Sequence, residues 1–119
     1  MEKGNSDSYY LDVNSDGKAL VGIFDGVFHN LIAPVALQTN TWYFVAGTYD
    51  GTSLRLYVNG TLVNSLVVVS SPFQTSEPLI LGWKFNGIPS DHFAGLIDEA
   101  RIYNRALSLA EIQELYNLP

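Results

Sequence analysis

Residues 41–64 read TWYFVAGTYDGTSLRLYVNGTLVN, a stretch that predicts two consecutive β-hairpins. Its aromatic and β-branched residues favour strands, because their side chains fit a pleated, half-buried surface. The dipeptides Asp50-Gly51 and Asn59-Gly60 interrupt these runs where the chain must reverse. Gly, Asn and Asp accept the positive φ angles that tight hairpin turns require. The stretch therefore predicts an antiparallel β architecture.

Composition narrows the class of protein. The chain has 119 residues, which is enough for one domain with a two-layer core. Hydrophobic residues make up 47% of it and charged residues 15%, which argues against disorder. The formal net charge of −6, with only six Lys and Arg, argues against nucleic acid as a partner, because phosphate contacts need basic side chains. The chain has no cysteine, which excludes disulfides, zinc-thiolate sites and thiol nucleophiles.

Neither a membrane span nor a targeting segment is visible in the sequence. No apolar run reaches the roughly 18 residues that a spanning helix needs. The opening residues, MEKGNSDSYY, lack the hydrophobic core of a signal peptide. We therefore expect that the chain either stays inside the cell or follows a signal that lies upstream of it.

The rest of the chain adds strands and one helix. Alternating or apolar runs predict further strands at residues 8–13, 18–24, 27–37, 61–69, 79–84 and 93–103. Residues 107–118 carry apolar side chains at helical spacing, and Ser108 with Glu111 forms a capping box. A helix this short must dock to be stable. We predict one domain, residues 1–119, that folds as an all-β, antiparallel two-sheet jelly-roll sandwich with a short C-terminal helix.

Two segments together resemble the laminin G-like, or concanavalin A-like, domains of bacterial extracellular proteins. They are TWYFVAGTYDGTSLRLYVNG at residues 41–60 and FAGLIDEARIYNRALSLAEIQELYN at residues 93–117, and the resemblance covers residues 4–117. Such domains bind sugars, bind proteins, accompany enzymes or space other modules. The resemblance implies a non-catalytic binding module for carbohydrate or glycoprotein, placed outside the cell or on its surface as part of an exported protein. The alternative is a structural or protein-interaction domain.

One departure from this family concerns the first strands. Family members usually begin with additional strands, whereas this sequence opens near the family's third or fourth strand. The missing strands would leave an unpaired sheet edge, which is a template for another chain. We therefore expect a homodimer formed by edge pairing or by exchange of an element. The alternative is a shorter, self-contained sandwich.

The carboxylates do not predict an enzyme. Asp98 and Glu99 are adjacent in a predicted strand, so their side chains point to opposite faces. Retaining glycosidases need two carboxyl groups about 5 Å apart. Glycosidases that resemble this fold carry a Glu-x-Asp-x-x-Glu pattern, which this sequence lacks. His29 has no nearby His and no Ser–His–Asp pattern, so it reads as an ordinary sheet residue.

Asp98 is the candidate metal ligand. It shares a strand face with Leu96 and Ile102, so we expect that face to be buried and the carboxylate to need a cation or several donors. One interpretation is a hydrogen-bond anchor to backbone N–H groups or an Arg. The other, implied by the resemblance, is a structural Ca²⁺ at Asp98. Residues 12–17 match the opening of a calcium loop, but Ile23 stands where the bidentate Glu belongs, which favours a hairpin turn.

The candidate sugar site is a loop near residue 83. Trp83, Asn86, Asp91 and His92 lie within ten residues and supply an aromatic ring with amide, carboxylate and imidazole groups. An aromatic face stacks on the apolar patch of a pyranose, and the polar groups bind its hydroxyls. Loops at the end of a sandwich often carry such residues. The alternative is that Trp83 caps the core, a role that we expect for Trp42.

Overall fold

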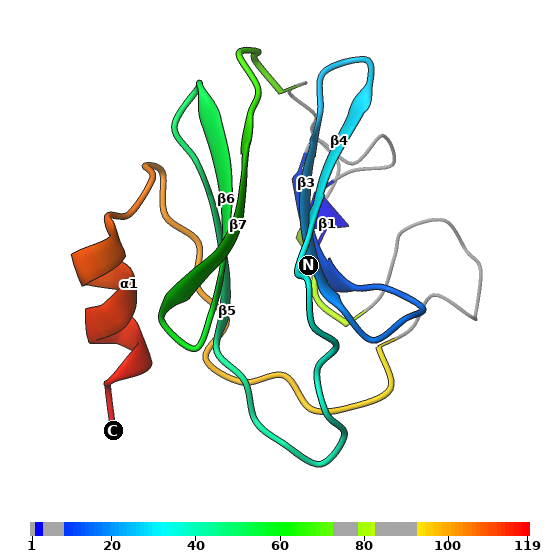
Figure 1. Cartoon of the computed structure of the whole chain (residues 1–119), viewed down its shortest axis with the longest axis vertical. Helices are drawn as coiled ribbons and strands as arrows, with labels where there is room; N and C mark the ends of the chain where they lie inside the picture. The colour runs from blue at the N-terminus through cyan, green and yellow to red at the C-terminus, as the bar shows by residue number, and fades with distance from the viewer. Residues whose placement is uncertain (1, 4–8, 73–78, 83–92) are drawn as a thin grey trace.

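The chain forms two antiparallel sheets that face each other as layers (Figure 1). This computed structural model describes residues 2–3, 9–72, 79–82 and 93–119. One sheet has five strands in the order β4-β3-β2-β1-β8, and the other has three in the order β5-β6-β7. The elements are β1 Glu2–Lys3, β2 Tyr9–Val13, β3 Ala19–Phe24, β4 Phe28–Ile32, β5 Val45–Tyr49, β6 Ser53–Val58, β7 Thr61–Val67, β8 Leu79–Ile80 and α1 Leu109–Tyr116. The predicted sandwich with a C-terminal helix is confirmed.

The two hairpin turns are made as their dipeptides predict. Asn59 and Gly60 both have positive φ, 51° and 75°, as a two-residue turn of type I′ requires. In the other turn, the Asp50 carboxylate accepts from Thr52 N at 2.9 Å and from Ser53 N at 2.7 Å. These backbone donors, together with Arg55, hold the pKa of Asp50 far below its ordinary value. Local hydrogen bonds thus fix β5, β6 and β7 in sequence order.

The predicted strand at residues 93–103 is wrong, because the structure places no strand in this segment. Glu99 has a φ of 51°, and a left-handed residue interrupts an extended run. Asp98 Oδ1 accepts a hydrogen bond from the Glu99 N–H at 2.8 Å, which supports the bend. The strand predicted at 27–37 is shorter than expected, since only Phe28–Ile32 joins the sheet before Pro34.

The main core lies between the two sheets. It consists of buried apolar side chains from both layers: Ala19, Val21, Ile23, Leu31, Ala33, Leu54, Leu56 and Val68. The layers approach closely at Gly47, where an added Cβ would lie 2.3 Å from Val21 Cγ2. Trp42, which we predicted to be in the core, is 64% exposed. It precedes β5, so it does not take part in the alternation that directs side chains inward.

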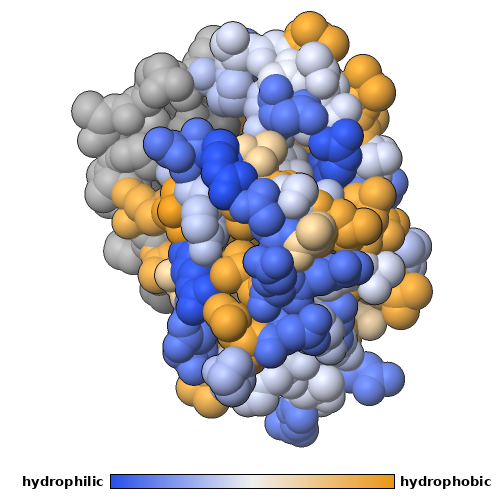
Figure 2. All heavy atoms as spheres, turned by 90° about the vertical axis from the view of Figure 1, so that its left-hand side faces the viewer, coloured by the Kyte–Doolittle hydropathy of each residue, from blue (hydrophilic) through white to orange (hydrophobic). Residues whose placement is uncertain are grey.

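Helix α1 covers part of the outer face of the three-stranded sheet (Figure 1). Ile112 of the helix is 1% exposed and packs with Tyr57 of β6 and with Leu107. The predicted capping box is confirmed, since Glu111 N donates to Ser108 Oγ and Ser108 N donates to Glu111. The surface on this side mixes many hydrophilic side chains with scattered hydrophobic ones (Figure 2). Docking of one apolar face therefore stabilises a helix of eight residues.

The start of α1 is also held by an ion pair that responds to pH. Arg105 donates from both guanidinium amino groups to the Glu111 carboxylate. Arg105, and next the Ser108 N–H, lower the pKa of Glu111 from 4.5 to about 2. Because the folded pKa is the lower one, Glu111 stabilises the fold above the unfolded pKa. That stabilisation is lost as the pH falls from about 5 to about 2.

We expect Glu111→Gln to lower the melting temperature at neutral pH and to make its decline below about pH 5 shallower than in the wild type. Melting temperatures of both proteins, measured across this range, test the prediction. Glu114→Gln, a change of the same kind on the same helix, is the control. If the melting temperatures of the wild type and Glu111→Gln fell by the same amount as the pH was lowered, the prediction would be contradicted.

Candidate functional site

Three aromatic rings and an amide gather on the outer face of the five-stranded sheet. We call Tyr10, Phe24, Phe28 and Asn30 the aromatic face. Tyr10 of β2 pairs with Gly22 of β3, which pairs with Asn30 of β4, so these three positions form one row across the sheet. Phe24 and Phe28 pair with each other at the end of the β3–β4 hairpin. Strand alternation puts both rows on the face opposite the buried Val21.

Gly22 lets the Tyr10 ring lie across β3. A Cβ at Gly22 would stand 2.2 Å from Tyr10 Cζ, so only glycine leaves room for the ring. The ring is thereby brought to Asn30, and Tyr10 OH donates to Asn30 Oδ1. Tyr10 itself is only 7% exposed, whereas Asn30 is exposed. This bond fixes the orientation of the Asn30 amide and leaves its Nδ2 donor available on the surface.

Phe28 presents an open ring beside this amide. Its centroid lies 4.6 Å from that of Phe24 and 6.3 Å from that of Tyr10, the latter in an edge-on arrangement. These contacts hold the ring in place, yet Phe28 remains 54% exposed. A fixed aromatic surface beside a few oriented polar groups is the usual chemistry of a small-molecule site. The aromatic face can therefore stack a flat apolar surface and hydrogen-bond a neighbouring hydroxyl.

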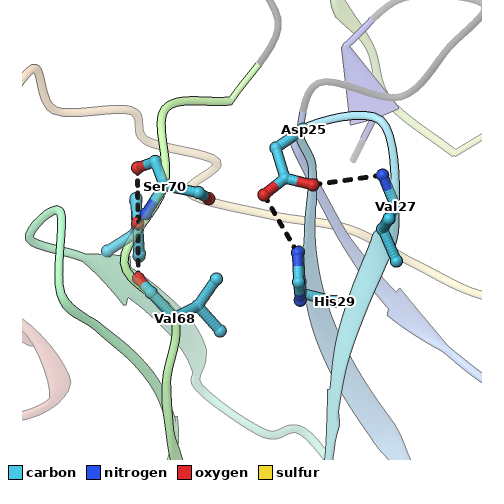
Figure 3. A network of polar contacts seen from close by, with 6 residues as sticks. Asp25, Val27, His29, Val68 and Ser70 are labelled. Atoms are coloured by element: carbon cyan, nitrogen blue, oxygen red, sulfur yellow. Dashed lines mark hydrogen bonds and ion pairs between the residues drawn. The ribbon is translucent and has the colours of Figure 1, made fainter.

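The β3–β4 hairpin that carries Phe28 is braced from its other side by a polar cluster (Figure 3). Asp25 Oδ1 accepts from Val27 N at 3.1 Å, and Asp25 Oδ2 lies 3.0 Å from His29 Nε2. Ser70, on the chain after β7, faces Asp25 across the end of the sandwich (Figure 3). His29 is thus a satisfied sheet residue, as predicted. The cluster positions the hairpin from which Phe24 and Phe28 project.

Electrostatics keep Asp25 ionised. The Ser70 hydroxyl has the largest effect and lowers the pKa of the Asp25 carboxyl. Burial opposes it, and the Val27 N–H and the His29 ring lower the pKa further. Ser70 Oγ is buried and forms no well-aligned hydrogen bond to any described residue. The carboxylate contacts His29 and faces Ser70. A nucleophilic relay instead needs the imidazole next to the hydroxyl, so these three residues do not form one.

The sequence-predicted sugar site lies outside the described residues, and this holds for Trp83, Asn86, Asp91 and His92. Asp98 is described and is exposed, so the expectation that its face is buried is wrong. The bend at Glu99 breaks the alternation on which that expectation depended. Within the described residues, no three His, Asp or Glu side chains gather as metal ligands would. The Ca²⁺ site at Asp98 stays a prediction.

Sequence reasoning missed the aromatic face, although part of its signal was present. Alternation along residues 20–24 and 28–32 places Phe24, Phe28 and Asn30 on sheet faces that a hairpin brings together. A glycine inside a strand, here Gly22, also marks a close approach of another group. The position of Tyr10 relative to Asn30 depends on the register of three strands, which the sequence pattern does not give.

Comparison with known proteins places the chain in a family. A profile described as the concanavalin A-like lectin/glucanases superfamily matches residues 1–113. The fold is similar to the crystal structure of an S-layer domain-containing protein from Clostridium thermocellum ATCC 27405, with 29% sequence identity and a TM-score of 0.58. That similarity covers 96% of this chain but only 58% of the other. No curated protein matches the sequence. In the described part of the chain, no helix is long and apolar enough to cross a bilayer.

Proposed function

Because the chain belongs to the concanavalin A-like lectin/glucanase superfamily, we propose that it is a non-catalytic binding module whose ligand is carbohydrate. The observation that carries this proposal is the half-exposed ring of Phe28, held by two other rings beside the oriented amide of Asn30. The superfamily supports a binding role, and the aromatic face supports sugar as the ligand. A free glycan or the glycan of a glycoprotein fits the same chemistry.

Recognition would divide between stacking and hydrogen bonding. The apolar face of a pyranose rests on the Phe28 ring, and a ring hydroxyl accepts a hydrogen bond from Asn30 Nδ2. Tyr10 acts as a positioning residue, because its hydroxyl holds Asn30 Oδ1 and so turns Nδ2 outward. The formal charge of −6 favours neutral glycans over strongly anionic ones, which an acidic protein repels.

In a gel that contains a polysaccharide to which the wild type binds, we expect Phe28→Ala to weaken retention of the protein by about tenfold, because the change removes the stacking surface. Asn30→Ala should weaken it by a similar factor through the lost donor. Val27→Ala is the matched control, since Val27 is adjacent, apolar and 63% exposed but lies in the turn before β4. Affinity electrophoresis over a panel of soluble polysaccharides measures all three variants. Equal retention of Phe28→Ala and Val27→Ala would contradict the aromatic face as the site.

The loop site remains a second proposal for the same function. Trp83→Ala, run in the same gels, separates the two locations. Loss of binding with Trp83→Ala, but not with Phe28→Ala, would place the ligand at Trp83, Asn86, Asp91 and His92 instead.

A structural Ca²⁺ at Asp98 would raise the melting temperature, a chelator would reverse the rise, and Asp98→Asn would abolish it.

Assembly is the second candidate function, and it comes from a different class. The observation in its favour is the segment at residues 93–103, which is outside both sheets and exposes large apolar side chains. Large exposed apolar patches often mark interaction sites. The similar Clostridium thermocellum structure is named as an S-layer domain-containing protein, which supports a place on the cell surface or outside the cell for this chain too. An obligate oligomer without glycan retention would favour this function over sugar binding.

A further inference from the structure

We infer that residues 93–103 become a β-strand when two copies of this chain meet, pairing antiparallel with the same segment of the second copy about a twofold axis at Ala100. This inference rests on the assembly function proposed above and specifies its interface. It does not depend on carbohydrate binding. Four features of the described residues carry it: the partly closed side of the sandwich at β4 and β7, the exposure of the segment, its backbone conformation and its charge pattern.

The first feature is that Asn64 partly closes the side of the sandwich where β4 and β7 are the edge strands. β4 and β7 are the edge strands of their sheets, and Asn64 of β7 joins them. Asn64 Nδ2 donates to the Ile32 carbonyl of β4 at 2.9 Å, and Asn64 Oδ1 accepts from Ser65 N at 2.9 Å. Strand addition needs unpaired N–H and C=O groups along an edge. One asparagine occupies such groups on both edges, so this side is a poor place for a second copy to add.

The second feature is that residues 93–103 expose apolar side chains and join neither sheet. Leu96 is 77% exposed, Ile97 50% and Ile102 51%, although the sequence of the segment favours a strand. Leu96 and Ile97 are adjacent and both exposed, so the segment presents continuous apolar surface to water. Pairing with a second strand would cover part of this surface and satisfy the backbone groups that lie along the segment. The segment has the composition of a strand, and its Phe93 N–H donates to the Gly82 carbonyl at 2.8 Å, but no strand of the described residues pairs along it.

The third feature is the conformation of Glu99. Its φ of 51° lies in the left-handed region, which is unfavourable for a residue with a long side chain. The Asp98 carboxylate compensates in part by accepting from the Glu99 N–H. In a strand, Glu99 would return to the extended region that ordinary residues prefer. Pairing therefore replaces a strained bend with an unstrained strand.

The fourth feature, charge, selects the register. A twofold antiparallel pair centred on Ala100 places Glu99 opposite Arg101 of the second copy, twice over. These residues already attract each other within one chain, where Arg101 Nη2 lies 3.0 Å from Glu99 Oε2. Moving the centre to Glu99 or to Arg101 sets like charges directly opposite each other, which is unfavourable. The Ala100 register also sets Ile97 against Tyr103 of the second copy.

A single cysteine tests this register, because the chain has none of its own. At the centre of the pair the two Cα atoms would lie about 4.5–5.5 Å apart, within the range that a disulfide spans. We expect Ala100→Cys to form a covalent dimer under mild oxidation, seen on a non-reducing gel. Val35→Cys is the control, since Val35 is 74% exposed and far along the chain from the segment. Equal cross-linking at both positions would overturn the inference.

A charge exchange tests the same pair without a covalent bond. We expect Glu99→Arg to weaken dimerisation by about tenfold or more, because like charges then face each other. The double variant with Arg101→Glu should restore it. Sedimentation velocity from low to high micromolar concentration measures both. A monomer at every concentration overturns the inference and the assembly function together. A dimer that Glu99→Arg leaves intact overturns the inference alone.

Discussion

Leu56→Ala is expected to lower the free energy of unfolding by about 2–5 kcal/mol, the range for a buried leucine that leaves a cavity. Leu56 is fully buried and belongs to the core cluster, whose side chains come from both sheets. The space left by its side chain cannot close easily, because the hydrogen-bonded ladders to β5 and β7 fix the backbone on either side. Urea unfolding followed by intrinsic fluorescence gives the change as a shift of the midpoint at constant slope.

Leu66→Ala is the matched control for this variant. Leu66 lies in the neighbouring strand and pairs with Leu54, but it is 38% exposed. Leu66→Ala removes the same atoms as Leu56→Ala. Its loss should cost clearly less, since water already reaches part of the side chain. Equal midpoint shifts for the two variants would show that the core does not lie where the structure places it.

The second large effect is expected at Gly47, where Ala should destabilise the fold by about 1–3 kcal/mol through overpacking. The added Cβ would stand 2.3 Å from Val21 Cγ2 and 3.0 Å from Val21 Cβ. Val21 has a short, stiff side chain in the facing sheet, so it cannot turn away without losing its own packing. The layers must therefore separate locally or the two strands must shift.

Val21→Ala provides a direct test of this mechanism. The double variant Gly47→Ala/Val21→Ala should lose less stability than the sum of the single variants, because each change relieves the other. Gly51→Ala is the control. Gly51 has a φ of 94° and no atom within 4 Å of an added Cβ, so its cost should be conformational and additive with Val21→Ala. Additivity at Gly47 would contradict the close approach of the sheets.

Local signals in the sequence predicted the elements that depend on neighbours along the chain. The turns at Asp50-Gly51 and Asn59-Gly60 are made by the positive φ values and side-chain bonds that these residues provide themselves. The start of α1 depends on Ser108 and Glu111, three residues apart. Such contacts form within one turn of chain, so pattern and residue type are sufficient to predict them.

The failures occurred where a partner far along the chain decides the outcome. Residues 93–103 have the alternation of a strand, but a strand needs a ladder to a neighbouring strand, and no strand of the described structure pairs with this segment. Trp42 has a large aromatic side chain of the kind that usually lies in a core, but it precedes β5 and remains exposed. Hydrophobic pattern states which side chains can be buried. Only the assembled sheets determine which of them are.

The sequence by itself therefore determined an antiparallel β-sandwich with a capped terminal helix, because turns, strand alternation and capping are short-range effects. Only the tertiary structure decided which residues form the candidate site. Tyr10, Gly22 and Asn30 belong to three strands. The aromatic face exists because the register of these strands places the Tyr10 ring over Gly22 and the Tyr10 hydroxyl against the Asn30 amide. Register is fixed by packing over the whole sheet, and no local stretch of the chain contains that information.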